Sequence, residues 1–225
     1  MRNFSNRNSR FFCILFFVVV AICFCSCKSK LEYFNYVSEL RSNIFLAQNE
    51  DFSLRIYAVE KENPYAPDGI KKETSHRTEV YLVAPSGEKN CELSFSVDGK
   101  TYGGEMSFDN VRAEYYYSCT LDISALTELP CEITYGESQL TLTAHSVKTP
   151  SVISPYNVLQ TLIQTETELF SSLTDKYGFA GEIYIRLLYE DSPYYYVGVM
   201  DRNGNAHAFL INAQTGKILA KRQAD

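Results

Sequence analysis

Histidine and cysteine are the side chains of this sequence best suited to metal binding, and both are sparse. The three histidines stand on separate stretches of the chain, at His76, His145 and His207. Zinc sites draw on close pairs such as His-x-x-x-His or Cys-x-x-Cys, because neighbouring ligands must converge on one ion. Neither pair occurs here. The sequence therefore predicts no metal site.

Motifs for nucleophilic catalysis and phosphate binding are also missing. No Gly-x-Ser-x-Gly segment is present, and Gly103-Gly104 falls in a strand-like run without a helix to lend its dipole to a phosphate. The spacing of Asp201, Asn203 and Asn205 echoes a calcium loop, but its glycine comes too early, so a hairpin turn fits better. We predict a protein that is not an enzyme and binds no cofactor.

Beyond the N-terminal segment the cysteines are Cys91, Cys119 and Cys131. Each shares strand parity with apolar neighbours, so all three are expected to point into a core. We expect buried free thiols. One disulfide is the alternative, because an exported protein can form disulfides.

Two tyrosine runs offer another chemistry, the stacking of rings on a ligand. Successive residues of a strand point to opposite faces, so residues 115–117 and 194–196 place rings on both sides. If one face packs inward, rings on the other are exposed and could stack on a sugar or grip a peptide. The candidate ligand contacts are Tyr115, Tyr116, Tyr194 and Tyr196.

Residues 40–149 form short alternating runs that are typical of strands. Turn residues separate the runs, and Asp98-Gly99 between two of them predicts a tight hairpin. About eight such runs with hardly any helical periodicity predict an antiparallel β-sandwich domain of immunoglobulin-like shape. The fold class is therefore mainly β, with a different organisation in the tail.

The period changes in residues 150–225. Apolar residues from Leu159 to Tyr177 recur at helical spacing, Ser154 fits the N-cap and Gly178 fits the C-terminal cap. The tail is thus a helix followed by an antiparallel sheet, an α+β unit. Its expected strands cover residues 180–189, 194–200 and 206–211.

The end of this tail carries a recognisable turn, Asn212-Ala213-Gln214-Thr215-Gly216-Lys217, followed by Ile218. With the order helix, strand, strand, strand, residues 154–222 resemble a PepSY-type domain, which typically ends in Asp-Ala-x-Thr-Gly-Lys and a hydrophobic residue. Asn212 stands where Asp is usual. The resemblance implies a non-catalytic module of bacterial envelope or secreted proteins that inhibits or binds, and it brings no catalytic residue.

Residues 1–26 have the layout of a bacterial lipoprotein signal peptide: three arginines, an apolar run over residues 11–24, and Ser26 directly before Cys27. Ser26-Cys27 resembles the lipobox of bacterial lipoproteins. We predict cleavage before Cys27, a lipid such as palmitate on Cys27, and a linker over residues 27–39. An uncleaved membrane anchor and simple secretion are the alternatives.

Composition fits a domain outside the cell. Removal of residues 1–26 deletes three arginines and no acidic residue, which leaves 18 basic against 27 acidic side chains, a net charge of about −9. Such a charge disfavours nucleic acid and anionic lipid headgroups as partners. We predict a protein lipid-anchored at the extracytoplasmic face of the cell membrane that binds an envelope protein or peptide. Cell-wall carbohydrate binding by exposed tyrosines is the alternative.

Overall fold

The computed structural model describes residues 31–85 and 89–223 of the chain. Tyr33–Asp225 is one compact unit. Cys27 and the predicted signal peptide over residues 1–26 lie outside the described residues. Among the described residues, no helix is long and apolar enough to cross a membrane.

The described chain is mainly β-structure with an antiparallel sheet, which confirms this part of the predicted fold class. The strands are β1 (Val37–Gln48), β2 (Ser53–Glu62), β3 (Thr74–Val83), β4 (Cys91–Val97), β5 (Lys100–Glu105), β6 (Ser107–Asp109), β7 (Glu114–Cys119), β8 (Glu128–Tyr135), β9 (Ser138–Ser146), β10 (Thr174–Asp175), β11 (Gly178–Phe179), β12 (Gly181–Tyr189), β13 (Pro193–Asp201), β14 (Ala206–Asn212) and β15 (Ile218–Gln223). The helices are the 3-10 turn η1 (Tyr33–Tyr36), α2 (Pro155–Thr165) and α3 (Thr167–Ser172).

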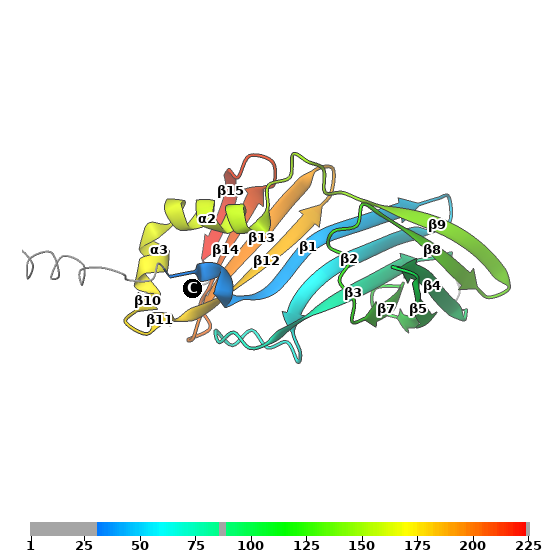
Figure 1. The fold of residues 1–225 in the computed structure, drawn as a ribbon, viewed down its shortest axis with the longest axis horizontal. Coiled ribbons are helices and arrows are strands. Elements are labelled where there is room, and N and C mark those ends of the chain that lie inside the picture. Colours follow the sequence, from blue (N-terminus) through cyan, green and yellow to red (C-terminus); the bar gives the residue numbers. More distant parts are fainter. Residues whose placement is uncertain (1–30, 86–88, 224–225) are drawn as a thin grey trace, which may run out of the picture. The chain divides into compact units, whose positions relative to one another are not determined.

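Within the described residues, thirteen strands form one hydrogen-bonded network (Figure 1). Its main path runs β15-β14-β13-β12-β1-β2-β3-β7-β6, and a branch of β9, β8, β4 and β5 leaves from β1. All pairs in this network are antiparallel except β1 with β12, which is parallel. The strands β10 and β11 pair separately.

Strand β1 joins two parts of this network. The first part contains strands β2 to β9, and the second part contains strands β12 to β15. Its N-terminal half pairs with β12, where Val37 lies opposite Ile183, and its C-terminal half pairs with β9, where Phe45 lies opposite Ser146. Within the stretch predicted as a linker, residues 27–39, the described chain forms η1 and the start of β1. The hydroxyl of Ser38 is buried and donates to the carbonyl of Ile183 at 3.4 Å, which fixes this early segment to β12.

The strands of the first part curl round a single core. β4 and β5 form the hairpin predicted at Asp98-Gly99, with Val97 opposite Lys100. β5 then approaches β7, where the hydroxyl of Tyr117 donates to the carbonyl of Gly103 at 3.2 Å. Alternate residues point inward as their period of two requires. They form one cluster that includes Phe45, Leu54, Ile56, Val80, Leu82, Phe95, Cys131 and Ile133.

In the second part, α2 and α3 cover one face of strands β12 to β15 (Figure 1). Ser154 caps α2 as predicted, and its side chain accepts a hydrogen bond from the amide of Asn157. The predicted single helix is wrong in length, because it breaks at Glu166 and α3 ends at Ser172. The hydroxyls of Thr161 and Thr165 donate to carbonyls one turn earlier, a contact that bends helices.

The break turns the apolar stripe of the helices toward the N-terminal segment. Phe170 is buried. Its ring packs edge-on against Tyr33, with centroids 5.1 Å apart, and stacks on Phe179 at 6.0 Å. Leu159 and Leu162 are also fully buried, as the sequence predicts. Tyr177, placed on the same stripe from sequence, is instead exposed in the turn between β10 and β11.

Candidate functional site

In the part of the chain that the structure describes, α2 and α3 cover one side of the second-part sheet. We call the opposite side, together with the outer surface of β1, β2, β3 and β7 that adjoins it, the open face. Tyrosine and arginine side chains follow one another across it from strand to strand. They are Tyr194 and Tyr196 on β13, Tyr184 and Arg186 on β12, Arg41 on β1, Arg55 and Tyr57 on β2, Tyr81 on β3 and Tyr116 on β7.

Over β12 and β13 these side chains stack closely. The rings of Tyr184 and Tyr196 lie nearly parallel with centroids 6.2 Å apart, and the guanidinium carbon of Arg186 lies 5.4 Å from the Tyr184 ring. Gly198 makes this arrangement possible, because a Cβ atom there would lie 1.7 Å from the Tyr184 ring. The lack of a side chain at residue 198 therefore lets one tyrosine lie across the neighbouring strand.

Over β1, β2, β3 and β7 the contacts continue. The Tyr81 ring lies between the rings of Tyr57 and Tyr116, with centroid distances of 5.4 and 5.1 Å. Two guanidinium groups lie over the same rings: the carbon of Arg41 is 3.9 Å from the centre of Tyr57, and that of Arg55 is 5.6 Å from Tyr81. These distances are within the range of cation–π attraction.

A hollow of about 660 Å³ opens where the two parts of the sheet meet. We call it the open-face groove. Arg41, Arg55 and Tyr57 line one side, and Tyr194 lines the other. Leucine and isoleucine side chains supply most of the remaining surface, at Ile44, Leu46, Leu188, Leu210 and Leu219, and Tyr189 and Glu190 complete it. The groove is therefore aromatic and aliphatic, with two guanidinium groups.

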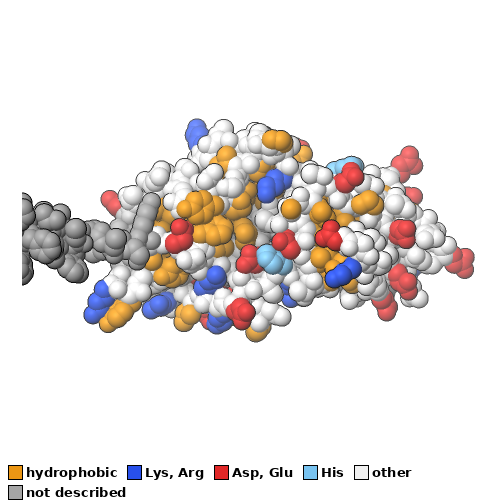
Figure 2. All heavy atoms as spheres, viewed as in Figure 1, with side chains coloured by type: hydrophobic (Ala, Val, Ile, Leu, Met, Phe, Trp, Pro, Cys, Tyr) orange, Lys and Arg blue, Asp and Glu red, His pale blue; other side chains and the backbone are white. Residues whose placement is uncertain are grey.

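The electrostatics of the open-face groove differ from those of the chain as a whole. Arg55 donates to Glu114 at 2.9 Å, whereas no ion pair joins Arg41 to a carboxylate among the described residues. The buried Nε atoms of both arginines have no hydrogen-bond partner within the described chain. Acidic side chains gather elsewhere, over β4, β5, β8 and β9 in the view of Figure 2. The groove therefore presents two guanidinium groups, of which only that of Arg55 is paired with a carboxylate among the described residues, and Glu190 also lines it.

Tyr81 shows how the hydroxyls of the open face are held. Burial and the carboxylate of Glu79 raise the pKa of Tyr81, and its hydroxyl donates to that carboxylate at 3.3 Å. Lys61 forms an ion pair with the same carboxylate. The Tyr81 hydroxyl therefore stays protonated, and its ring keeps a fixed orientation.

Three of the four tyrosines predicted as ligand contacts lie on the open face, but β12, β1, β2 and β3 separate the one on β7 from the two on β13. Tyr116, Tyr194 and Tyr196 are half-buried on the open face. Tyr115 must be corrected: it is 3% exposed and packs in the core against Phe108, and its hydroxyl donates to the carbonyl of Lys89. Strand alternation turns its ring away from that of its neighbour.

Sequence reasoning missed the arginines and tyrosines of β1, β2, β3 and β12 that complete the open face. Arg55 and Tyr57 share strand parity, so the pattern contained the signal that they lie on one face. Their meeting with Arg41, Tyr81 and the β13 tyrosines depends on strand order, above all on the parallel pairing of β1 with β12. A single sequence does not provide that pairing.

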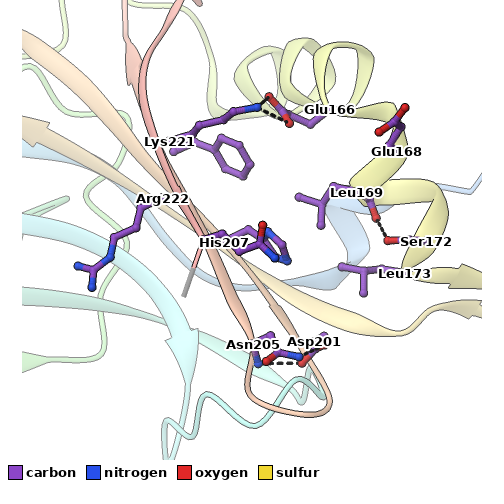
Figure 3. A pocket seen from close by; sticks show the side chains of 12 residues that line it. Glu166, Glu168, Leu169, Ser172, Leu173, Asp201, Asn205, His207, Lys221 and Arg222 are labelled. Carbon is purple, nitrogen blue, oxygen red and sulfur yellow. Dashed lines mark hydrogen bonds and ion pairs between the residues drawn. The ribbon is translucent and has the colours of Figure 1, made fainter. Parts of the chain in front are cut away.

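A second hollow, of about 880 Å³, lies on the other side of the sheet between α3 and strands β14 and β15 (Figure 3). His207 projects into it and faces Leu169, Ser172 and Leu173 across the space (Figure 3). At one edge Lys221 and Glu166 form an ion pair at 3.4 Å. Asp201 and Asn205 lie at the far end of the hollow.

The polar groups of this second hollow serve the local structure. The hydroxyl of Ser172 donates to the carbonyl of Leu169 at 2.8 Å. Asp201 accepts hydrogen bonds from Asn205 and from the Asn203 amide, and these bonds hold the pKa of its carboxyl below the usual value. Among the described residues, no hydrogen bond or ion pair joins His207 to an acid or a hydroxyl. The turn predicted at residues 201–205 is confirmed.

The other candidate groups for chemistry stand apart. His76 lies 3.8 Å from Asp122, and His145 lies 3.7 Å from Glu128, both at exposed positions. Within residues 31–85 and 89–223, no group of three or more His, Cys, Asp or Glu side chains could hold a metal ion. The strands thus keep the histidines as separate as they are in the sequence.

The three cysteines of the described chain are free, in agreement with the predicted thiols. Cys91 and Cys131 are fully buried, and burial raises their pKa values to about 11 and about 12. Cys119 is half-buried beside the same core. Thiols with raised pKa values are poor nucleophiles at neutral pH.

Comparison of the chain with protein-family models, with curated proteins and with solved structures found no match.

Proposed function

We propose that this protein is a non-enzymatic lipoprotein of the bacterial envelope that binds a protein or peptide segment on its open face. One observation carries the proposal: the run of tyrosine rings and guanidinium groups that leads into the open-face groove, on the side of the sheet that α2 and α3 leave uncovered. Tyrosine and arginine are enriched at the energetic centres of protein interfaces. Their rings and stems contribute apolar area while their polar ends give direction.

The chemistry of the open-face groove favours a segment with an acidic side chain beside an apolar one. Arg41 has a guanidinium held over Tyr57 and no carboxylate partner among the described residues. A carboxylate of the partner would bind there, since a guanidinium binds a carboxylate through paired hydrogen bonds. An apolar side chain next to it would pack on Leu188 and Leu210.

The finer description of the fold belongs to the same proposal. We propose that residues 40–149 are an immunoglobulin-like β-sandwich and that residues 150–225 are a PepSY-like domain. The single core enclosed by the first part supports the former, and the order of α2 followed by β12 to β15 supports the latter. A PepSY-like domain is expected to bind without catalysing, which agrees with a binding surface shared by both parts.

The predicted location at the outer face of the cell membrane is tested by the N-terminus. The motif at Ser26-Cys27 supports cleavage before Cys27 and a lipid on its sulfur. Mass spectrometry of the protein from its native membrane should find a lipidated Cys27 as the first residue. An intact Met1 would favour the uncleaved anchor, and an unmodified Cys27 at the start of the chain would favour simple secretion.

Binding is tested with the full chain purified in detergent, on an array of peptides that vary in acidic and apolar content. Peptides with an acidic residue next to a large apolar one should bind, and the variants Arg41→Ala and Tyr57→Ala should weaken binding about tenfold or more. Tyr177→Ala removes an exposed tyrosine away from the open face and should bind as the wild type does. Equal binding by all variants would contradict the assignment of the groove.

Carbohydrate binding is the second candidate, favoured by the uncovered rings of Tyr116, Tyr194 and Tyr196. Soluble cell-wall glycan fragments, tested alongside the peptides, separate the two functions. Binding of glycan that is lost in Tyr196→Ala and retained in Arg41→Ala would replace the peptide proposal. Binding of acidic peptides alone would support it.

A further inference from the structure

The loop between β2 and β3, residues 63–73, encloses two buried carboxyl groups. Glu62, the last residue of β2, is 1% exposed, and Glu182 on β12 is fully buried. The loop is fastened to the first of these, because the amide of Lys72 donates to Glu62 Oε1. At its middle Gly69 lies against the β13–β14 turn, where a Cβ atom would come within 2.6 Å of the Asp201 carbonyl oxygen.

Three of the four oxygens of these carboxyl groups lack a hydrogen-bond partner in the described chain. Neither oxygen of Glu182 accepts or donates a hydrogen bond of good geometry in the described chain, and Glu62 Oε2 is equally without a partner. Buried polar atoms are nearly always hydrogen-bonded. Two buried carboxylates that repel each other do not both stay ionised, because the repulsion raises the pKa of at least one of them. A proton on Glu182 would give this buried carboxyl group a donor and would remove one negative charge.

The cations around this pair are engaged by other acids. Arg186 of β12 donates to Glu39 of β1 through Nε at 2.8 Å. Lys72 of the loop forms an ion pair with Asp68 at 2.6 Å. Arg186 and Lys72 are therefore already bound to other carboxylates.

The remaining groups that face the pair include a phenol and a backbone amide. Tyr65 of the loop interacts with both Glu39 and Glu182, and Tyr184 of β12 interacts with the same two acids. Burial first, and then the charges of Glu62 and Asp68, raise the pKa of Glu182 to about 7 against the opposing effects of the Gly69 amide and Lys72. Near neutral pH Glu182 therefore changes its charge.

We propose that residues 63–73 are a proton-dependent cover on the open face. The cover is shut when Glu182 holds a proton, and it opens when that proton passes to the solvent and leaves a buried carboxylate that Glu62 repels. Opening exposes Glu182 and uncovers the part of the open face that holds Glu39 and Arg186. The device depends only on the loop and its carboxyl groups, so it stands independently of any ligand.

Hydrogen exchange of the full chain in detergent tests the cover. Amide protection of residues 63–73 is measured at about pH 5.5 and about pH 8.5 and corrected for the intrinsic rate. Protection should fall roughly tenfold or more at the higher pH, since ionisation of a group with a raised pKa shifts the closed–open equilibrium with pH. The amide of Lys72 should show the largest change, because it donates to Glu62. Equal corrected protection at the two pH values overturns the proposal.

Two variants tie the effect to the pair. Glu182→Gln is uncharged at every pH, so protection should stay high at both pH values. Glu62→Gln should do the same, because its carboxamide can no longer repel Glu182. Glu137→Gln, at an exposed hairpin turn, makes the same charge change elsewhere and should behave as the wild type does. A wild-type pH dependence in both Glu182→Gln and Glu62→Gln would also overturn the proposal.

Discussion

The guanidinium carbon of Arg41 lies 3.9 Å from the centre of the Tyr57 ring, and the buried Arg41 Nε has no hydrogen-bond partner in the described chain. The ring thus stabilises a charge that no carboxylate of the described residues neutralises. A cation–π contact of this kind, shielded from water, is worth about 1 kcal/mol or more. It positions Arg41 for an outside acceptor.

A double-mutant cycle measures this relationship. Tyr57→Phe keeps a ring and should leave the free energy of unfolding nearly unchanged, whereas Tyr57→Leu should lower it by about 1 kcal/mol. In the Arg41→Ala background the cost of Tyr57→Leu should shrink, as it does when two residues are coupled. Urea unfolding of the four proteins gives the coupling energy. A value of zero would show that the contact stabilises nothing.

Gly198→Ala should disturb the open face without touching either core. Its Cβ would overlap the Tyr184 ring, so the ring must leave its place on Tyr196. Such overpacking typically costs about 1–3 kcal/mol, to be measured as a loss in the free energy of unfolding. In the Tyr184→Leu background the same substitution should cost less. An equal cost in both backgrounds would mean that the Tyr184 ring is not the cause.

Phe170→Ala should destabilise the second part of the sheet. The ring is buried against Tyr33 and Phe179, and its removal leaves a cavity worth about 3 kcal/mol or more. Tyr177→Ala, in an exposed turn a few residues away, is the matched control and should have little effect. Thermal unfolding of both variants makes the comparison. An unchanged midpoint for Phe170→Ala would show that the assigned face is wrong.

Glu182 should make the stability of the chain fall as pH rises. Its folded pKa, about 7, lies above the ordinary value of 4.5, so the folded state holds a proton that the unfolded state has released. The cost is absent below about pH 4, grows between the two pKa values and reaches at most about 3 kcal/mol above pH 7. Glu182→Gln should therefore gain stability over the wild type at pH 8 and match it at pH 4. A constant difference across this range would rule out a raised pKa.

The thiols should report on burial. Cys119 is half-buried and should react first with a disulfide reagent in the native state, while Cys91 and Cys131 should react only after unfolding. All three should react in urea without a reductant. If only one of these thiols reacts in urea, the other two form a disulfide.

The features that the sequence predicted correctly are mostly those set by residues close together in the chain. The hairpin at Asp98-Gly99 and the cap at Ser154 depend on neighbours within a turn of the chain, and the burial of Leu159 and Phe170 follows from the local spacing of apolar residues. The helix break at Glu166 was missed because hydrophobic spacing continues across it. Long-range pairing was beyond reach, since no local pattern brings Val37 beside Ile183.

The residues of the open face also divide into those that local sequence patterns predict and those that depend on long-range strand pairing. Strand alternation correctly placed at least one ring of each tyrosine run outside the core. It did not determine whether Tyr115 or Tyr116 is the exposed ring, because that depends on which side of the strand packs inward. The arginine partners stand on other strands, and their contacts follow from register. The sequence also did not reveal the buried carboxyl groups of Glu62 and Glu182. They stand on β2 and β12, two strands that are connected only through β1.

The placement of β1 also governs the order in which the chain can fold. Its N-terminal half has β12 as one of its two neighbours, and that strand begins only at Gly181. A pairing between such distant segments is slow to form, because the intervening chain must first be ordered. Until β12 has emerged, the first strand presents an unpaired edge that could join another chain. A chain that stops short of Gly181 should therefore aggregate instead of yielding a smaller soluble protein.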